Sequence, residues 1–140
     1  MEAYPGADLM TGIDTNVLVR FLVADDPRQA ERAHAFLARS RSHGEVVYVS
    51  AVVLCEAVWV LRSVYRQPRL RILQVMETLL GTDVFQLEAE DAVRAAIQSC
   101  RKGKGDFADH LIAQMNLAKG CRGTVTFDRS LGGAPGFTLL

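Results

Sequence analysis

Residues 11–23 read TGIDTNVLVRFLV, an apolar and β-branched run that contains one acid, Asp14. Ile13 follows Gly12, and residues 17–23 are mostly apolar, so we expect a buried strand to end near Asp14 and the chain to turn into a short helix. An ionised carboxylate is costly to remove from water unless a positive group meets it. The presence of Asp14 in this apolar stretch therefore needs an explanation.

Acids in a similar setting recur along the chain, on otherwise apolar or small-residue stretches. They are Glu56 in LCEA, Asp106 and Asp109 in GDFAD, and Asp128 in TFD. These positions lack a basic residue close by on the same element, so a positive partner has to come from elsewhere. If the fold gathers the acids at one place, a divalent metal ion is the obvious partner.

The composition is that of an ordinary folded domain: 140 residues, 49% of them hydrophobic, with a formal net charge of zero. One domain is therefore expected, and any nucleic-acid binding must come from a local basic patch. The three cysteines are far apart and show no CxxC spacing, which favours a reducing compartment over a disulfide framework or a zinc site. The longest apolar stretch, 46–61, falls short of a membrane span. We expect a cytoplasmic protein without a membrane partner.

Capping patterns and apolar spacing predict the order of the elements. Asp26-Pro27-Arg28-Gln29 starts a helix that runs to about Ser40, and Ser50 caps an apolar helix to about Arg66. Further helices are expected at 69–80, 88–100 and 106–119, and further strands at 45–49, 84–87, 123–127 and 137–140. This alternation predicts an α/β domain: an open, mostly parallel sheet of about four or five strands, flanked by helices on both faces.

The predicted domain spans residues 10–140. Residues 1–9, MEAYPGADL, contain a proline and a glycine and show no periodicity. We interpret them as a disordered or non-native leading segment, or as an upstream start, and leave them out of the fold.

The carboxyl ends of parallel strands form the functional edge of an open sheet. Asp14 and Asp128 follow the first and fourth predicted strands, and Asp106 and Asp109 share the first turn of a helix, where the helix dipole favours acids. Glu56 lies about a turn and a half into a helix that starts at the same edge. All five acids are therefore able to face one cleft.

Each acid also has a simpler explanation when it is taken alone. Asp106 is a good N-cap residue, and Asp128 is a good turn residue before Arg129-Ser130. Glu56 is harder to explain as a solvated residue, because apolar residues surround it on every face of the predicted helix. The acids together are a stronger signal than any one of them.

The acidic motifs resemble a known signature. Ile13-Asp14-Thr15-Asn16-Val17-Leu18, the helical Glu56, the segment 105–113 (GDFADHLIA) and Thr126-Phe127-Asp128 are similar to the PIN-domain ribonucleases. The stretch through Arg20 and Asp25-Asp26-Pro27 resembles, more narrowly, the VapC toxins of type II toxin–antitoxin pairs. The resemblance covers residues 11–140 and fills all the acidic positions of the family.

This resemblance implies a role for each matched residue. The catalytic and metal-binding acids would be Asp14, Glu56, Asp109 and Asp128, with Asp106, Asn16 and Thr126 as auxiliary residues. Asn16 and Thr126 match positions that hold carboxylates or water by hydrogen bonds. The family acts as Mg²⁺- or Mn²⁺-dependent endoribonucleases, usually as homodimers, and a cognate antitoxin protein covers the cleft.

The residues suggest how such a site would work. Magnesium prefers oxygen ligands, and we predict Asp14 and Asp109 as the most direct ones. Glu56 and Asp128 would hold water or a second ion, and either of them would orient or deprotonate the attacking water. Cleavage would then leave a 5′-phosphate and a 3′-hydroxyl.

Basic residues supply candidate RNA contacts. Arg101, Lys102 and Lys104 lead directly into Asp106 and would bind phosphate at the rim of the cleft, although a solvated loop is an equal alternative. A second basic group would continue such a track if the first binds RNA: Arg62, Arg66, Arg69 and Arg71. We expect His110 on a helix surface without a catalytic role, and Trp59 in the core or in a dimer contact.

Three other classes of protein place acids in a similar way. A haloacid dehalogenase-type phosphatase needs a second Asp where Asn16 stands, and a phospho-receiver domain needs paired acids after the first strand and a late lysine that we cannot place. A catalytically inactive PIN-like binding module is the remaining alternative, although it has little use for five costly carboxylates.

Overall fold

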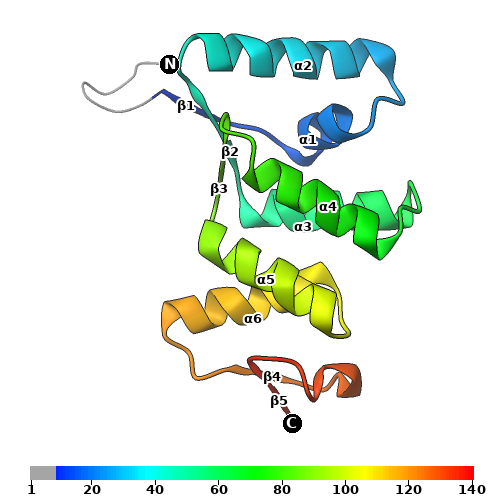
Figure 1. The fold of residues 1–140 in the computed structure, drawn as a ribbon, viewed down its shortest axis with the longest axis vertical. Coiled ribbons are helices and arrows are strands. Elements are labelled where there is room, and N and C mark those ends of the chain that lie inside the picture. The colour runs from blue at the N-terminus through cyan, green and yellow to red at the C-terminus, as the bar shows by residue number, and fades with distance from the viewer. Residues whose placement is uncertain (1–8) are drawn as a thin grey trace. The chain divides into compact units, whose positions relative to one another are not determined.

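Strands and helices alternate along the chain in the predicted order (Figure 1). The computed structural model describes residues 9–140, and what was expected of residues 1–8 lies outside the described part. The helices and strands are β1 (Met10–Gly12), α1 (Thr15–Leu22), α2 (Pro27–Ser42), β2 (Val46–Val49), α3 (Ala51–Ser63), α4 (Arg69–Leu80), β3 (Phe85–Leu87), α5 (Glu90–Lys102), α6 (Phe107–Lys119), β4 (Thr124–Thr126), the 3₁₀ helix η1 (Arg129–Leu131) and β5 (Phe137–Leu139).

Contacts divide the chain into two compact units, the first ending at Glu88 and the second comprising Ala89–Leu140. The first unit contains a three-stranded parallel sheet in the order β1-β2-β3. The central strand β2 is held on both sides, and its Val47 and Val49 are fully buried. Pairing begins at Leu9, whose carbonyl accepts a hydrogen bond from the Val46 N–H at 2.9 Å.

The first strand differs from its prediction in burial. We expected a buried strand, but Met10 is 42% exposed. The reason is the strand order, because β1 lies at an edge of its sheet. Helices of this unit pack on the other strands, α2 against β2 and α4 against β3.

The second unit is a helix pair with a small sheet. The helices α5 and α6 pack side by side (Figure 1), and Val93 and Ala96 of α5 and Leu111 and Ala113 of α6 are buried. Gly120 ends α6 in the left-handed conformation, with φ of 107°, which glycine adopts without strain. The strands β4 and β5 pair in parallel.

The α/β class and the parallel pairing are confirmed, but the strands of the described residues form two sheets instead of one open sheet. The physical reason lies in how short they are. The strands are three or four residues long, so only a few backbone hydrogen bonds join each pair of strands. The short connection 127–136 also brings β5 directly beside β4.

Local capping explains most helix starts. The Asp26 and Ser50 side chains accept hydrogen bonds from the Gln29 and Val53 N–H groups, as predicted. The expected capping box at Asp26 is only half formed, because the Gln29 side chain accepts a hydrogen bond from Arg20 instead. No helix in residues 9–140 is long and apolar enough to cross a membrane.

Candidate functional site

Asp14 caps the first helix of the first unit. It follows β1, and its Oδ1 atom accepts the Val17 N–H at 3.0 Å, which satisfies one of the free donors at the start of α1. The side chain is exposed and lines a pocket of about 630 Å³ between β1, α1 and α2. Asn16 and Arg20 line the same pocket. Asn16 therefore lies at the same pocket as Asp14, and its auxiliary role stays a prediction.

Glu56 lies on the exposed side of α3, so the expectation that apolar residues enclose it is wrong. The helix has one buried face, formed by residues such as Leu54 and Leu61, and it leaves apolar side chains on its other face as well. Trp59 is 56% exposed and is not a core residue of the described chain. The high apolar content of α3 thus reflects two apolar faces, one of them on the surface.

Asp106 and Asp109 begin α6 in the second unit. Asp106 is the N-cap residue, and its N–H donates to Asp109 Oδ2 at 3.0 Å in a capping-box arrangement. Asp106 is exposed and Asp109 is half-buried. The capping role of Asp106 is therefore confirmed, and Asp109 uses one carboxylate oxygen within the helix start.

Asp128 follows β4 and caps the short helix η1. Its Oδ1 atom accepts the Ser130 N–H at 2.9 Å and the Ser130 hydroxyl at 2.7 Å, and these bonds lower the pKa of the Asp128 carboxyl. Thr126 Oγ1 accepts the Asp128 N–H at 3.0 Å. The Thr126 hydroxyl therefore holds the backbone N–H of Asp128. We expected this hydroxyl to hold a carboxylate or water, and that role stays a prediction.

The structure brings Asp106 and Asp109 together at the start of α6. Asp14 and Glu56 belong to the first unit, whereas Asp106, Asp109 and Asp128 belong to the second. Neither unit, in the described residues, holds three or more His, Cys, Asp or Glu side chains placed for one metal ion. The gathering of all the acids stays a prediction.

The donor chemistry of these acids fits Mg²⁺ or Mn²⁺. Both ions prefer hard carboxylate oxygens and keep several waters, so an exposed carboxylate suits them. Asp14, Asp109 and Asp128 each use one oxygen in a helix cap, through Oδ1, Oδ2 and Oδ1 respectively. A carboxylate has two oxygens, so a cap leaves the second one available for a cation.

His110 is buried, with only 1% of its surface exposed, so the expectation of a helix-surface position is wrong. Its Nε2 atom lies 2.7 Å from the Lys104 carbonyl oxygen, and its ring packs edge-on against Phe137. Because a carbonyl only accepts, Nε2 carries a proton and donates. His110 thus fastens the loop that precedes Asp106 to α6.

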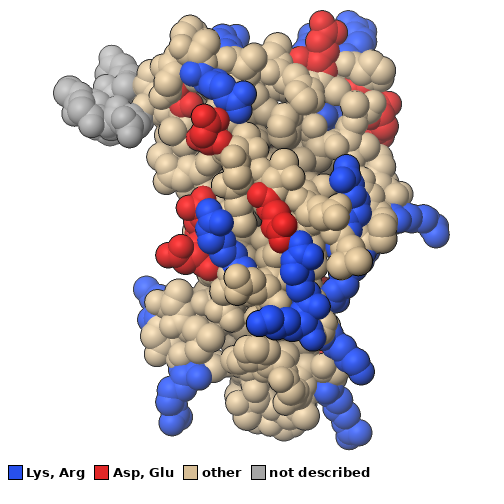
Figure 2. All heavy atoms as spheres, viewed as in Figure 1, with Lys and Arg blue, Asp and Glu red and all other residues tan. Residues whose placement is uncertain are grey.

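The basic loop is shorter than predicted, because α5 continues to Lys102. Arg101, Lys102 and Lys104 are all exposed. Figure 2 shows Lys and Arg side chains projecting from the surface of the second unit. The contact of these residues with an RNA phosphate stays a prediction.

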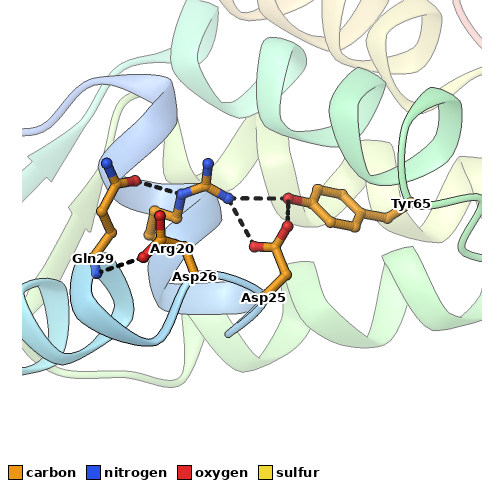
Figure 3. Close-up of polar contacts among 5 residues, drawn as sticks. All are labelled: Arg20, Asp25, Asp26, Gln29 and Tyr65. Atoms are coloured by element: carbon orange, nitrogen blue, oxygen red, sulfur yellow. Dashed lines mark hydrogen bonds and ion pairs between the residues drawn. The ribbon is translucent and has the colours of Figure 1, made fainter.

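A polar network in the first unit was missed from the sequence (Figure 3). Arg20 Nη1 donates to Asp25 Oδ1 at 2.7 Å and to the Tyr65 hydroxyl oxygen at 3.1 Å, and the Tyr65 hydroxyl donates to Asp25 Oδ2 at 2.7 Å. The Tyr65 hydrogen bond, aided by Arg20, lowers the pKa of Asp25. Tyr65 is 40 residues from Asp25, so no local pattern marks the contact.

Two comparisons with known proteins identify the family of the chain. The model of the PIN domain family matches residues 13–135, a range that runs through both units and includes every candidate acid. The chain is also 31% identical, over 117 residues, to a VapC ribonuclease of Aquifex aeolicus (strain VF5), and the alignment covers 84% of this chain and 86% of that protein. The chain therefore belongs to the PIN domain family, as a VapC-type member.

Proposed function

We propose that this protein is a metal-dependent endoribonuclease and the toxin component of a type II toxin–antitoxin system. The observation that carries the proposal is the family match over residues 13–135, which contains Asp14, Glu56, Asp106, Asp109 and Asp128. The VapC ribonuclease relative, similar over most of both chains, supports RNA as the substrate.

Asp14, Glu56, Asp109 and Asp128 would hold the Mg²⁺ or Mn²⁺ cofactor. Their exposed or half-exposed carboxylates offer the oxygen ligands that these cations prefer. A bound divalent cation lowers the pKa of water and stabilises the charge that develops on a phosphate.

The side chains of the protein would orient the reactants. Glu56 or Asp128 would accept the proton of the attacking water. The hydrogen bonds from Ser130 lower the pKa of the Asp128 carboxyl, which keeps the carboxylate ionised as a cation ligand but makes it a weaker proton acceptor. Attack on phosphorus breaks the bond to the 3′ oxygen and leaves a 5′-phosphate and a 3′-hydroxyl. Asp106 would support Asp109 through their shared helix start.

Three exposed basic residues, Arg101, Lys102 and Lys104, would contact the phosphates of the RNA substrate. Such contacts position a strand without reading its sequence, and they weaken as salt rises.

A cognate antitoxin would inhibit the enzyme by covering the acids, and the pocket that Asp14 and Arg20 line is open to a segment of such a partner. We further propose a homodimer that acts in the cytoplasm, where RNA is present and the three free thiols stay reduced.

A cleavage assay tests this function. The purified protein, free of antitoxin, is incubated with end-labelled total RNA, with and without Mg²⁺ or Mn²⁺, next to Asp109→Asn. Asp91→Asn is the matched control, because Asp91 is also an acid in the first turn of a helix in the second unit but is not a candidate ligand.

Discrete fragments that need the metal, persist in Asp91→Asn and vanish in Asp109→Asn would support the nuclease. The absence of cleavage by the wild-type protein, or equal cleavage by Asp109→Asn, would favour the inactive binding module or a contaminating nuclease.

A further inference from the structure

A second pocket lies entirely within the second unit, apart from the pocket that contains Asp14. Its volume is about 490 Å³, and it lies between the C-terminal end of α5 and the connection from η1 to β5. The residues that line it are Ala95, Gln98, Ser99, Lys102, Gly103, Lys104, Ser130, Gly133, Ala134 and Pro135.

The lining carries positive charge and no acid. Lys102 and Lys104 are exposed, and no ion pair of either one occurs in the described residues. The helix dipole explains a lysine in the last turn of α5, where Lys102 lies. It does not explain Lys104, which lies beyond the helix at the same pocket. Two lysines that converge on one concavity favour an anion such as a phosphate.

The rest of the lining suits the other parts of a nucleotide. Ala95, Ala134 and Pro135 provide apolar surface on which a base can lie. Gln98 brings an amide that both donates and accepts, as the edge of a base requires. The volume is within the range of pockets that enclose small ligands.

The pocket also adjoins the acids of the same unit. Ser130, which lines it, donates its hydroxyl to Asp128 at 2.7 Å. Lys104 is two residues before Asp106, and its carbonyl is held by His110. A nucleotide bound here would therefore belong to a strand that continues toward Asp128 and Asp109.

We propose that this pocket binds one nucleotide of a single-stranded RNA substrate. Lys102 and Lys104 hold its phosphate, Ala95 and Pro135 contact its base, and Gln98 hydrogen-bonds to the edge of the base and sets a base preference. The inference rests on the proposed function, because it takes RNA as the substrate, and it adds a subsite that selects the sequence next to the cleaved bond.

The test measures RNA binding in the absence of divalent metal, so that cleavage plays no part. The fluorescence anisotropy of a labelled single-stranded RNA oligonucleotide is followed for the full-length protein in EDTA. Ala95→Trp fills the pocket without changing its charge, and Lys102→Ala with Lys104→Ala removes the positive charge. The controls in the same unit are Ala118→Trp and the pair Lys119→Ala with Arg122→Ala, all at exposed positions outside the pocket.

We expect about tenfold weaker binding for both pocket variants and unchanged binding for both controls. The dependence of log affinity on log salt should become shallower by about 0.7 per lost phosphate contact for the lysine pair. Normal binding by Ala95→Trp, with circular dichroism showing a folded protein, would mean that the lysines act at an open surface and would overturn the inference. The absence of RNA binding by the wild-type protein would also overturn it.

The base preference is tested with Gln98→Ala on homopolymeric RNA oligonucleotides of the four bases. Gln74→Ala, on the exposed side of α4, is the control. We expect Gln98→Ala to reduce the difference in affinity between the preferred base and the others, and Gln74→Ala to leave it intact. If Gln98→Ala keeps the same order of affinities for the four bases and the same differences between them, Gln98 does not read the base.

The two proposals fail in different ways. If the pocket variants bind RNA normally while metal-dependent cleavage persists, the subsite is rejected and the nuclease stands. If the wild-type protein binds RNA but does not cleave it, the nuclease is rejected and the subsite stands.

Discussion

At the scale of single residues, the candidate acids combine two roles. Asp14, Asp106 and Asp128 are each the N-cap residue directly before a helix. The sequence allowed this to be predicted for Asp106, because an N-cap depends on neighbours three positions away. It did not allow the burial of His110 to be predicted, because the carbonyl and the ring that surround His110 come from the loop before α6 and from β5.

The capping role of Asp14 permits a substitution that separates stability from activity. Asn caps a helix about as well as Asp, so Asp14→Asn should keep the free energy of unfolding within a few tenths of a kcal/mol, whereas Asp14→Ala should lose about 1 kcal/mol. Both variants should lose RNA cleavage, because neither keeps the carboxylate. Urea unfolding and the cleavage assay check this together. Retained cleavage in Asp14→Asn would show that Asp14 serves only the helix.

At the scale of elements, helix and strand types were predictable, but several ends were not. The helix α3 ends at Ser63 instead of near Arg66, and α5 begins at Glu90 instead of Glu88. Arg66 and Ala89 have φ of 53° and 54°, and such left-handed conformations are not expected of these residue types. The Glu88 side chain also accepts the Ala51 N–H at 2.8 Å, a contact between distant segments that no local pattern reveals.

The Arg20–Asp25–Tyr65 network joins α1, the loop before α2 and the segment after α3, and it makes stability depend on pH. The pKa of Asp25 is lowered in the folded protein, so its contribution is present above its ordinary pKa, near 4, and is lost as pH falls through the lowered value. Tyr65→Phe removes the main cause of the shift. We therefore expect a shallower loss of unfolding free energy below about pH 5 than in the wild-type protein.

Urea unfolding between about pH 3 and pH 7 measures this difference. Tyr48→Phe is the control, because the Tyr48 hydroxyl makes no hydrogen bond to another side chain within the described residues. Equal pH dependence in Tyr65→Phe and the wild-type protein would show that the network does not hold Asp25 in its ionised form.

The loop between α5 and α6 depends on Gly105. Its φ is 98°, and a Cβ atom placed there would lie 2.5 Å from Leu131 Cδ2 and 3.3 Å from His110 Nε2. Gly105→Ala should therefore lower the free energy of unfolding by about 1–3 kcal/mol. Gly133→Ala, where a Cβ would meet nothing within 4 Å, should be nearly neutral. Equal stability of the two variants would contradict the close packing of this loop.

At the scale of the whole molecule, the alternation of strands and helices was enough to predict an α/β fold with parallel pairing, and the family match confirms it. The division of the strands into two sheets was not predictable. The choice of partner for a strand of three residues depends on tertiary contacts, not on its own pattern. For the same reason, the sequence could identify Asp14 and Asp109 as candidates but could not place them.

The proposed nuclease requires that Asp14 of the first unit and Asp109 of the second serve the same reaction step. Residues that act as a unit lose activity non-additively, so a double variant should be no worse than the poorer single variant. The measurement is the single-turnover rate of cleavage of one RNA oligonucleotide in Mn²⁺ by wild-type protein, Asp14→Asn, Asp109→Asn and the double variant.

We predict that each single variant loses about 10³-fold or more in rate and that the double variant loses no more than the poorer of the two. Wild-type rates in either single variant, or losses that multiply in the double variant, would contradict a shared role for the two acids.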